Sequence, residues 1–270
     1  MFLRDIKAMP YIDLTSPSAK KIFIQFFFTQ EDPDDSGYTL DLYRVLRGHD
    51  PIKIGEVDLN ECFYFIDTIE AGVTLLNLEY QYMVFKKGSP VCKGTTVPVT
   101  LRNKQHFLSH RAFLVNYMME MRPGVGIGID VQVVKKKRWG VFCSTCGSHG
   151  SNAPTLHKCP TCGGTGYEGG YYPPFPQSIS LAGLSVSESH EGGLGVSAGA
   201  SFSAQVFPYP VLERGDWLWI PSENLVIGID VVQGYDGVSG SVTLQHISGT
   251  KVNQFESPEF EFLYKKGVFK

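Results

Sequence analysis

The stretch LEYQYMVFKK, residues 78–87, decides the fold class of this chain. Its alternate positions carry apolar or aromatic side chains: Leu78, Tyr80, Tyr82 and Val84. Side chains two residues apart lie on the same face of an extended strand, whereas a helix would place residues three or four apart on one face. The stretch therefore predicts a β-strand with one buried face.

Three stretches before it have a similar character: KIFIQFFF, YTLDLYRVLRG and ECFYFIDT, which begin at Lys21, Tyr38 and Glu61. Such β-branched and aromatic residues are enriched in strands. EDPDDSG, residues 31–37, carries the Pro, Asp and Gly that favour turns. Short strands separated by turns predict a β-sandwich over residues 1–90.

In the rest of the chain the residue pattern changes from strand-like to helical and then back to strand-like. LRNKQHFLSHRAFLVNYMMEMR, residues 101–122, lacks Gly and Pro and has apolar residues near helical spacing, which predicts a connecting helix within residues 91–142. Alternation resumes at VGIGIDVQVV, from Val125. After a Pro-rich break, residues 175–270 predict a second β-module, a barrel or a sandwich, and the terminal EFEFLYKKG, residues 259–267, is included in it.

Composition limits the function classes. The net charge is −3, so nothing in the overall balance indicates nucleic acid or an anionic membrane as a partner. No apolar window approaches the length of a membrane span, and the N-terminus has no secretory-type apolar core. We therefore expect synthesis and folding in a cytoplasm, where reduced thiols favour metal binding over disulfides.

Residues 143–174, CSTCGSHGSNAPTLHKCPTCGGTGYEGGYYPP, contain four of the six cysteines. Cys143 and Cys146 form one Cys-x-x-Cys pair, and Cys159 and Cys162 form a second pair after twelve residues. Four thiolates at this spacing are typical of a zinc ribbon, in which they fill a tetrahedral coordination sphere. The spacing therefore predicts structural Zn²⁺, because catalytic zinc keeps one position open for water.

Several alternatives remain open at this site. Iron in a rubredoxin-like site, disulfides and a redox Cys-x-x-Cys compete with zinc. His149 and His157 lie between the pairs and could replace a cysteine, although exposed loop histidines are the simpler interpretation. Cys62 and Cys92 stand alone and are interpreted as buried or incidental thiols.

A basic and aromatic run precedes the first cysteine pair: Lys135, Lys136, Lys137, Arg138 and Trp139. Such a run at a zinc ribbon is a candidate interaction patch for phosphates and bases. The acidic net charge favours a solvated face or a protein partner instead, so direct contact with nucleic acid is not expected. No phosphate loop, nucleophile elbow or H-E-x-x-H motif is present, and we expect no enzyme activity.

The run CPTCGGTGYEGGYYPP, residues 159–174, resembles a run found in virion structural proteins of tailed bacteriophages, in which a basic and aromatic stretch also precedes the first cysteine pair. GDWLWIPSENLVIGIDVVQGYDGVSGSVTLQHI, from Gly215, is similar to their C-terminal β-domain. The N-terminal strands are similar to their fibronectin type III-like (Ig-like) module. The resemblance touches most of the chain, but only the cysteine and glycine run is specific.

This resemblance implies a mainly β structural component of the neck, collar or head-to-tail connector, made in the host cytoplasm and located in the virion. It implies a homo-oligomer with portal, adaptor, tail or collar proteins as neighbours and no membrane contact. A baseplate or tail protein is an alternative within the same class. Alternatives from other classes are a zinc-ribbon nucleic-acid binder and a DnaJ-like chaperone module, which has the C-x-x-C-x-G-x-G repeat of residues 159–166.

Overall fold

The computed structural model describes residues 2–13, 19–29, 37–46, 48–70, 78–96, 114, 117, 128–146, 159–180, 201–236, 242–252 and 258–268. Within these ranges the chain is mainly β, as the sequence predicts. It divides into two compact units. Unit 1 holds the described residues up to Tyr117 together with 138–142, and unit 2 holds the remainder. The predicted connector and zinc-ribbon segments are therefore parts of these units and not separate bodies.

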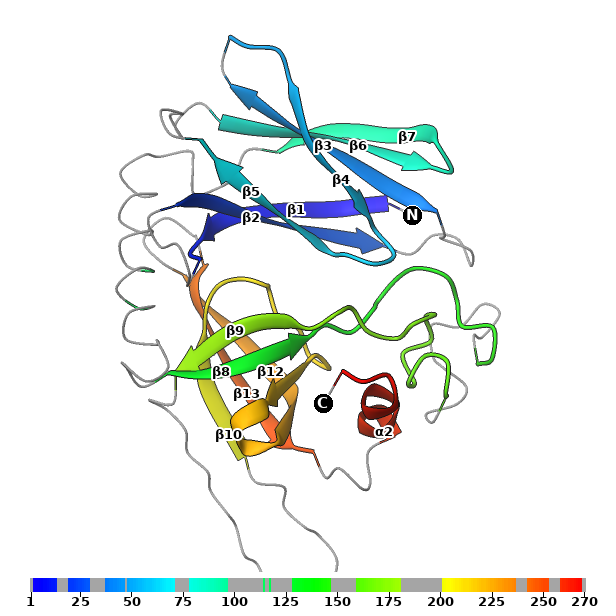
Figure 1. Ribbon diagram of the computed structural model, residues 1–270, viewed down its shortest axis with the longest axis vertical. Coiled ribbons are helices and arrows are strands. Elements are labelled where there is room, and N and C mark those ends of the chain that lie inside the picture. Colours follow the sequence, from blue (N-terminus) through cyan, green and yellow to red (C-terminus); the bar gives the residue numbers. More distant parts are fainter. Residues whose placement is uncertain are drawn as a thin grey trace, which may run out of the picture. The chain divides into compact units, whose positions relative to one another are not determined.

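The described part of unit 1 contains two antiparallel sheets (Figure 1). One sheet has the order β1-β2-β5, with bounds β1 (Phe2–Tyr11), β2 (Lys20–Thr29) and β5 (Tyr64–Ile69). The other has the order β4-β3-β6-β7, with bounds β3 (Tyr38–Leu46), β4 (Ile52–Asp58), β6 (Leu78–Lys86) and β7 (Ser89–Thr96). The sequence predicts β2, β3, β5 and β6 but not β1, β4 or β7.

Both sheets contribute to one hydrophobic core. The alternation predicted for β6 is confirmed at Leu78, Tyr80 and Val84, which are at most 1% exposed, whereas Tyr82 is half-buried against the same core. Ile24 from β2 and Leu40 from β3 are fully buried in the same cluster. Burial of these side chains is the main force that holds unit 1 together, at about 1.5–3 kcal/mol for each fully buried large apolar side chain.

Trp139 belongs to this core and lies in a short segment of unit 1, residues 138–142, which is flanked in the sequence by Lys137 and Cys143 of unit 2. The indole is 5% exposed, and its ring centroid lies 4.7 Å from that of Phe28 on β2. Aromatic pairs at this separation add to the energy of area burial. The chain between Lys137 and Cys143 is therefore anchored in unit 1 by Trp139.

A buried polar contact joins the two sheets of unit 1. The hydroxyl of Tyr80, on β6, donates a 2.7 Å hydrogen bond to the carboxylate of Asp67, on β5. Arg44 lies 3.8 Å from the same carboxylate, and Glu70 lies 3.9 Å from Arg44. Burial raises the pKa of Asp67 and Glu70 adds to this rise, although the Tyr80 hydrogen bond and the Arg44 charge act against it.

The raised pKa of Asp67 predicts a pH dependence of stability. The protonated Asp67 side chain contributes to the stability of the folded state. This contribution is complete below the ordinary aspartate pKa of about 4, and it is lost as the pH rises through the raised pKa in the folded protein. Asp67→Asn keeps an acceptor for Tyr80 but does not titrate. We expect the wild type to lose stability relative to D67N as the pH rises above about 4. Chemical denaturation of both proteins across this range measures the difference, and parallel curves would contradict it.

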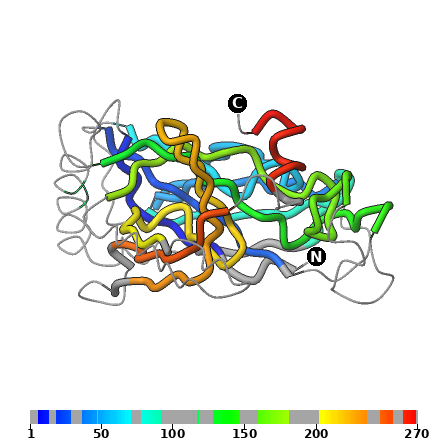
Figure 2. The backbone as a smooth tube through the Cα atoms, turned by 90° about the horizontal axis from the view of Figure 1, so that it is seen from below, coloured from blue at the N-terminus to red at the C-terminus, as the bar shows by residue number. Residues whose placement is uncertain are grey.

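Unit 2 contains a closed six-stranded antiparallel barrel in the order β10-β13-β12-β11-β8-β9, with β9 and β10 paired to close it. The strands are β8 (Gly128–Val134), β9 (Phe175–Ser180), β10 (Ser201–Val206), β11 (Trp217–Ile220), β12 (Leu225–Asp236) and β13 (Val242–Lys251). A short 3₁₀ helix, η3 (Pro221–Glu223), joins β11 to β12. The predicted C-terminal module is thus a barrel, and it includes β8 from the predicted connector. Figure 2 shows the backbone of these strands from a second direction.

The prediction of a terminal strand is wrong, because residues Pro258–Lys265 form the helix α2. The sequence analysis included this stretch in the β-module, but Phe260 and Leu263, three residues apart, are both buried, as suits a helix. Tertiary packing against Trp217 and Tyr171 decides the conformation. Glu261 and Lys265, four residues apart, form a 2.6 Å ion pair that suits a helix.

The predicted connecting helix at 101–122 lies outside the described residues except for Leu114 and Tyr117, which are helical and buried. Among the described residues, no helix has the length and apolar character needed to cross a membrane.

The loop 207–216 between β10 and β11 is held by buried polar side chains of the barrel. Gln245 donates to the carbonyls of Phe207 and Pro210 and accepts from the N–H of Leu212. Lys135 donates to the carbonyl of Val211 at 2.9 Å. Since a buried backbone carbonyl or N–H without a partner is costly, these contacts fix the loop against the barrel.

The same loop ends in a buried ion pair. Lys135 Nζ lies 2.5 Å from Asp216 Oδ2, and the two side chains are 5% and 0% exposed. Asp216 also accepts from the N–H groups of Lys136 and Glu213. The Asp216 carboxylate thus pairs with one buried ammonium group and accepts hydrogen bonds from two backbone N–H groups.

Candidate metal centre

Two short turns, called here the knuckles, carry the four cysteines. The first is Cys143–Cys146 and the second is Cys159–Cys162, and both have the sequence Cys-x-Thr-Cys. In each knuckle the two-residue gap lets both sulfurs face the same point. The hydroxyls of Thr145 and Thr161 lie 2.9 Å apart in a hydrogen bond that joins the two turns.

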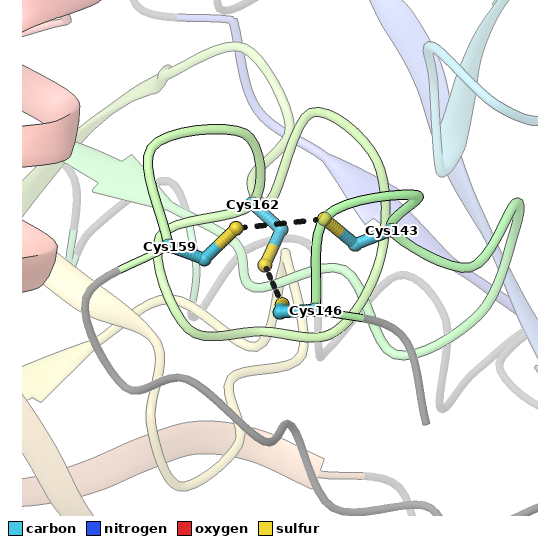
Figure 3. Close-up of side chains that lie close together, drawn as sticks. All are labelled: Cys143, Cys146, Cys159 and Cys162. Carbon is cyan, nitrogen blue, oxygen red and sulfur yellow. Dashed lines mark hydrogen bonds between the residues drawn. The ribbon is translucent and has the colours of Figure 1, made fainter. Parts of the chain in front are cut away.

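The four sulfur atoms converge (Figure 3). All lie within 4.8 Å of one another, and each cysteine is at most 3% exposed. Cys143 Sγ is 3.5 Å from Cys159 Sγ, and Cys146 Sγ is 3.2 Å from Cys162 Sγ. The described cysteines are all free thiols. The structure therefore brings the four predicted ligands together.

The chemistry and size of this cluster fit a metal ion. Zinc–thiolate bonds of about 2.3 Å in a tetrahedron would place neighbouring sulfurs about 3.8 Å apart. The observed separations of 3.2 Å, 3.5 Å and at most 4.8 Å bracket that value. Four sulfurs complete a tetrahedral sphere, so a bound ion would have no open position for substrate or water.

The electrostatics of the cluster favour a cation. Burial raises the pKa of Cys146, and the adjacent thiols raise it further. Burial also acts to raise the pKa of Cys159, but the N–H groups of Thr161 and Cys162 outweigh it. Together with the neighbouring thiols they lower this pKa to about 6. The N–H groups of the second knuckle thus favour a thiolate at Cys159. Four thiolates together need a divalent ion to offset their repulsion.

The glycine and tyrosine run after the second knuckle completes the site. Thr165 donates from its hydroxyl to the carbonyl of Cys162 at 3.0 Å. The N–H of Gly166 points to Cys162 Sγ at 3.4 Å, and its carbonyl accepts from the N–H of Cys143 at 2.8 Å. The chain then pairs back onto the segment before the first knuckle, where Gly170 accepts from Lys137 N–H. The run therefore ties both knuckles to one another.

Helix α2 covers the second knuckle through Phe262, which is 6% exposed. Gly163, with φ +60°, lies so close that an added Cβ would meet the Phe262 ring at 2.6 Å. At Gly170, with φ +69°, an added Cβ would meet the carbonyl oxygen of Cys162 at 2.4 Å. Only glycine fits either position, because each combines a left-handed backbone with a close approach.

A matched pair of glycine variants tests this close approach. Gly48 has φ +82° and open space around an added Cβ, so Gly48→Ala should cost only the left-handed strain of about 1–2 kcal/mol. Gly170→Ala carries the same strain and also collides with backbone, so we expect it to cost clearly more and to weaken metal retention. Thermal unfolding and metal analysis of both variants provide the measurement. Equal losses of stability with unchanged metal content would contradict the argument.

The accessory ligands named from sequence are not placed. His149 and His157 lie outside the described residues. Cys62 is partly buried and donates from Sγ to the carbonyl of Tyr64, and burial raises its pKa. The side chain of Cys92 is outside the described part. Only the four knuckle cysteines meet among the described His, Cys, Asp and Glu residues as a group that could hold a metal.

The predicted interaction patch has buried ends. Lys135 is 4% exposed and pairs with Asp216, and Trp139 is 5% exposed in the core of unit 1. Lys136, Lys137 and Arg138 are half-buried. Lys137 lies over the ring of Tyr172 at 5.4 Å. Lys135 and Trp139 are therefore buried instead of facing solvent.

Sequence reasoning missed Phe262, which packs against the second knuckle, and Asp216, the buried partner of Lys135. Neither has a local sequence signal, since each acts through contacts with residues that are distant in the chain.

No family model matches the chain, and no curated protein or solved structure matches it.

Proposed function

We propose that this chain is a structural component of a tailed-phage virion, present in many copies in the neck, collar or head-to-tail connector region and stapled by Zn²⁺. The observation that carries the proposal is the run Cys159–Pro174, whose sequence resembles that of such proteins. Its residues have interlocking roles: the cysteines converge, and Thr165, Gly166 and Gly170 tie the knuckles together. Substitutions in this run would therefore disrupt the cysteine cluster more readily than substitutions elsewhere in the chain.

Zinc in a structural role follows from the donor set. Four buried cysteines fill a tetrahedral sphere, and a short glycine-rich segment buries too little apolar area to fold without a staple. Cys143, Cys146, Cys159 and Cys162 would hold the ion, which would supply folding energy and no reaction step.

The strand order of unit 1 supports the fibronectin type III-like part of the proposal. Strands one, two and five form one sheet, and strands four, three, six and seven form the other. Both sheets are antiparallel and share one core. Seven strands in two sheets around one core suit an Ig-like sandwich, and this three-plus-four order suits the fibronectin type III variant. Such modules suit a building block that packs against virion neighbours or copies of itself.

The proposal is tested on phage particles purified from host cells in which the phage genome that encodes this chain is expressed. The expected result is co-purification of the chain with portal and tail proteins in fixed proportion through a density gradient, measured by quantitative mass spectrometry. Sedimentation of the isolated chain should also show a defined homo-oligomer. A chain that is absent from purified particles and strictly monomeric would overturn the virion proposal, whatever its metal content.

A further inference from the structure

The two knuckles face each other residue for residue. Three pairs meet across the cluster, and the members of each pair are sixteen residues apart in the sequence: Cys143 with Cys159, Thr145 with Thr161, and Cys146 with Cys162. The two turns are thus related by an approximate local symmetry. Figure 3 shows the sulfur contacts running from one turn to the other.

This pairing places specific thiols in reach of each other. The cross-knuckle sulfur distances of 3.5 Å and 3.2 Å would shorten to about 2.05 Å in a disulfide, which is a movement of less than about 1.5 Å. The Thr145–Thr161 hydrogen bond holds the two turns together at their midpoints. Cys62, the other described thiol, belongs to unit 1 and donates to a backbone carbonyl there.

We propose that the site is also a thiol-redox site: when the metal is lost in the presence of a disulfide oxidant, it closes into the two cross-knuckle disulfides Cys143–Cys159 and Cys146–Cys162. The link between the knuckles then survives in covalent form. This inference rests on the four-cysteine site and not on the virion proposal.

The chemistry balances with oxidised glutathione as the oxidant. The divalent ion leaves without a change of oxidation state. A cysteine thiolate attacks one glutathione sulfur, forms a mixed disulfide and expels a glutathione thiolate. The facing thiolate then attacks the protein sulfur of that mixed disulfide, forms the cross-knuckle bond and expels a second glutathione thiolate. Each protein disulfide transfers two electrons to one oxidised glutathione, so two disulfides consume two molecules of oxidant.

Burial sets the order of these events. The four cysteines are at most 3% exposed, so the oxidant reaches them only after the site opens. We expect slow oxidation of the metal-loaded protein and fast oxidation once a strong chelator has removed the ion.

The sequence offers a direct readout. Trypsin cleaves after Arg138, Lys158 and Arg214, which places the two knuckles on separate peptides, 139–158 and 159–214. Cross-knuckle disulfides keep these peptides joined under non-reducing conditions. Disulfides within each Cys-x-x-Cys would leave them separate, each lighter by two hydrogen atoms. Mass spectrometry of chelated and oxidised protein should find the joined pair, and separate, lighter peptides would overturn the proposal.

Two double variants test which sulfurs pair. C143S/C159S keeps the facing thiols Cys146 and Cys162, whereas C143S/C162S keeps the diagonal thiols Cys146 and Cys159. Both variants lose two ligands and retain one thiol on each knuckle. We expect the facing pair to form its disulfide several times faster with oxidised glutathione, as followed by loss of free thiol. Equal rates would overturn the assigned pairing. If the purified protein contained no metal, the proposal of structural zinc would fail. The disulfide pairing would still be tested, because the peptide readout needs no metal.

Discussion

Cys159→Ser is expected to abolish stoichiometric metal binding and to make both knuckles open more often. Cys159 is 1% exposed and lies 3.5 Å from Cys143, so its loss opens the sphere and leaves three buried thiols facing a hydroxyl. Structural zinc contributes an apparent 10–16 kcal/mol to the folding of small zinc domains, so we expect a large loss of local stability and frequent opening of the knuckles. Faster tryptic cleavage after Lys137, whose N–H is bonded to the carbonyl of Gly170, and a lower unfolding temperature are the measurements.

The effect should extend to helix α2, because Phe262 packs against the second knuckle at Gly163. The control is Cys62→Ser, which changes a partly buried thiol in unit 1. C62S should retain its metal and its resistance to cleavage after Lys137. If C159S retained both properties, the four-cysteine cluster would not be a structural metal site.

Asp216→Ala is expected to destabilise the barrel by about 3–5 kcal/mol, the cost of breaking a buried ion pair by removing one partner. The variant leaves the Lys135 ammonium buried without its 2.5 Å partner and leaves the N–H groups of Lys136 and Glu213 without their acceptor. Chemical denaturation followed by tryptophan fluorescence gives the free energy of unfolding.

An exposed ion pair provides the matched control. Glu261 and Lys265 lie 2.6 Å apart with side chains 62% and 72% exposed, so Glu261→Ala should change stability by no more than about 1 kcal/mol. A double variant, D216L/K135M, removes the buried charges together and should be closer to wild type than D216A. If D216A and E261A lost equal stability, the buried pair would not be what holds the 207–216 loop.

The β class of the chain and the four ligands could be predicted because their signals are local. Alternation at Leu78, Tyr80 and Val84 reports a buried face directly, and the Cys-x-x-Cys spacing predicts which sulfurs come together. Both patterns depend on residues a few positions apart. The structure confirms the β class and brings the four sulfurs together.

The rest depends on contacts distant in the sequence. The EFEF pattern at 259–262 indicated a strand, but packing of Phe262 and Leu263 against the barrel favours a helix. The basic run before Cys143 suggested an exposed surface. Lys135 is instead buried beside Asp216, 81 residues later, and Trp139 is buried beside Phe28, far earlier in the chain. No pattern within a short window records such pairings.

The metal content of the protein, purified without added metal and measured by elemental mass spectrometry alongside a count of free thiols, tests the central claim most directly. The account predicts one zinc per chain. It also predicts that the four thiols of Cys143, Cys146, Cys159 and Cys162 resist modification until a chelator removes the ion. A protein that contains no metal, with these four thiols reacting at once, would contradict it.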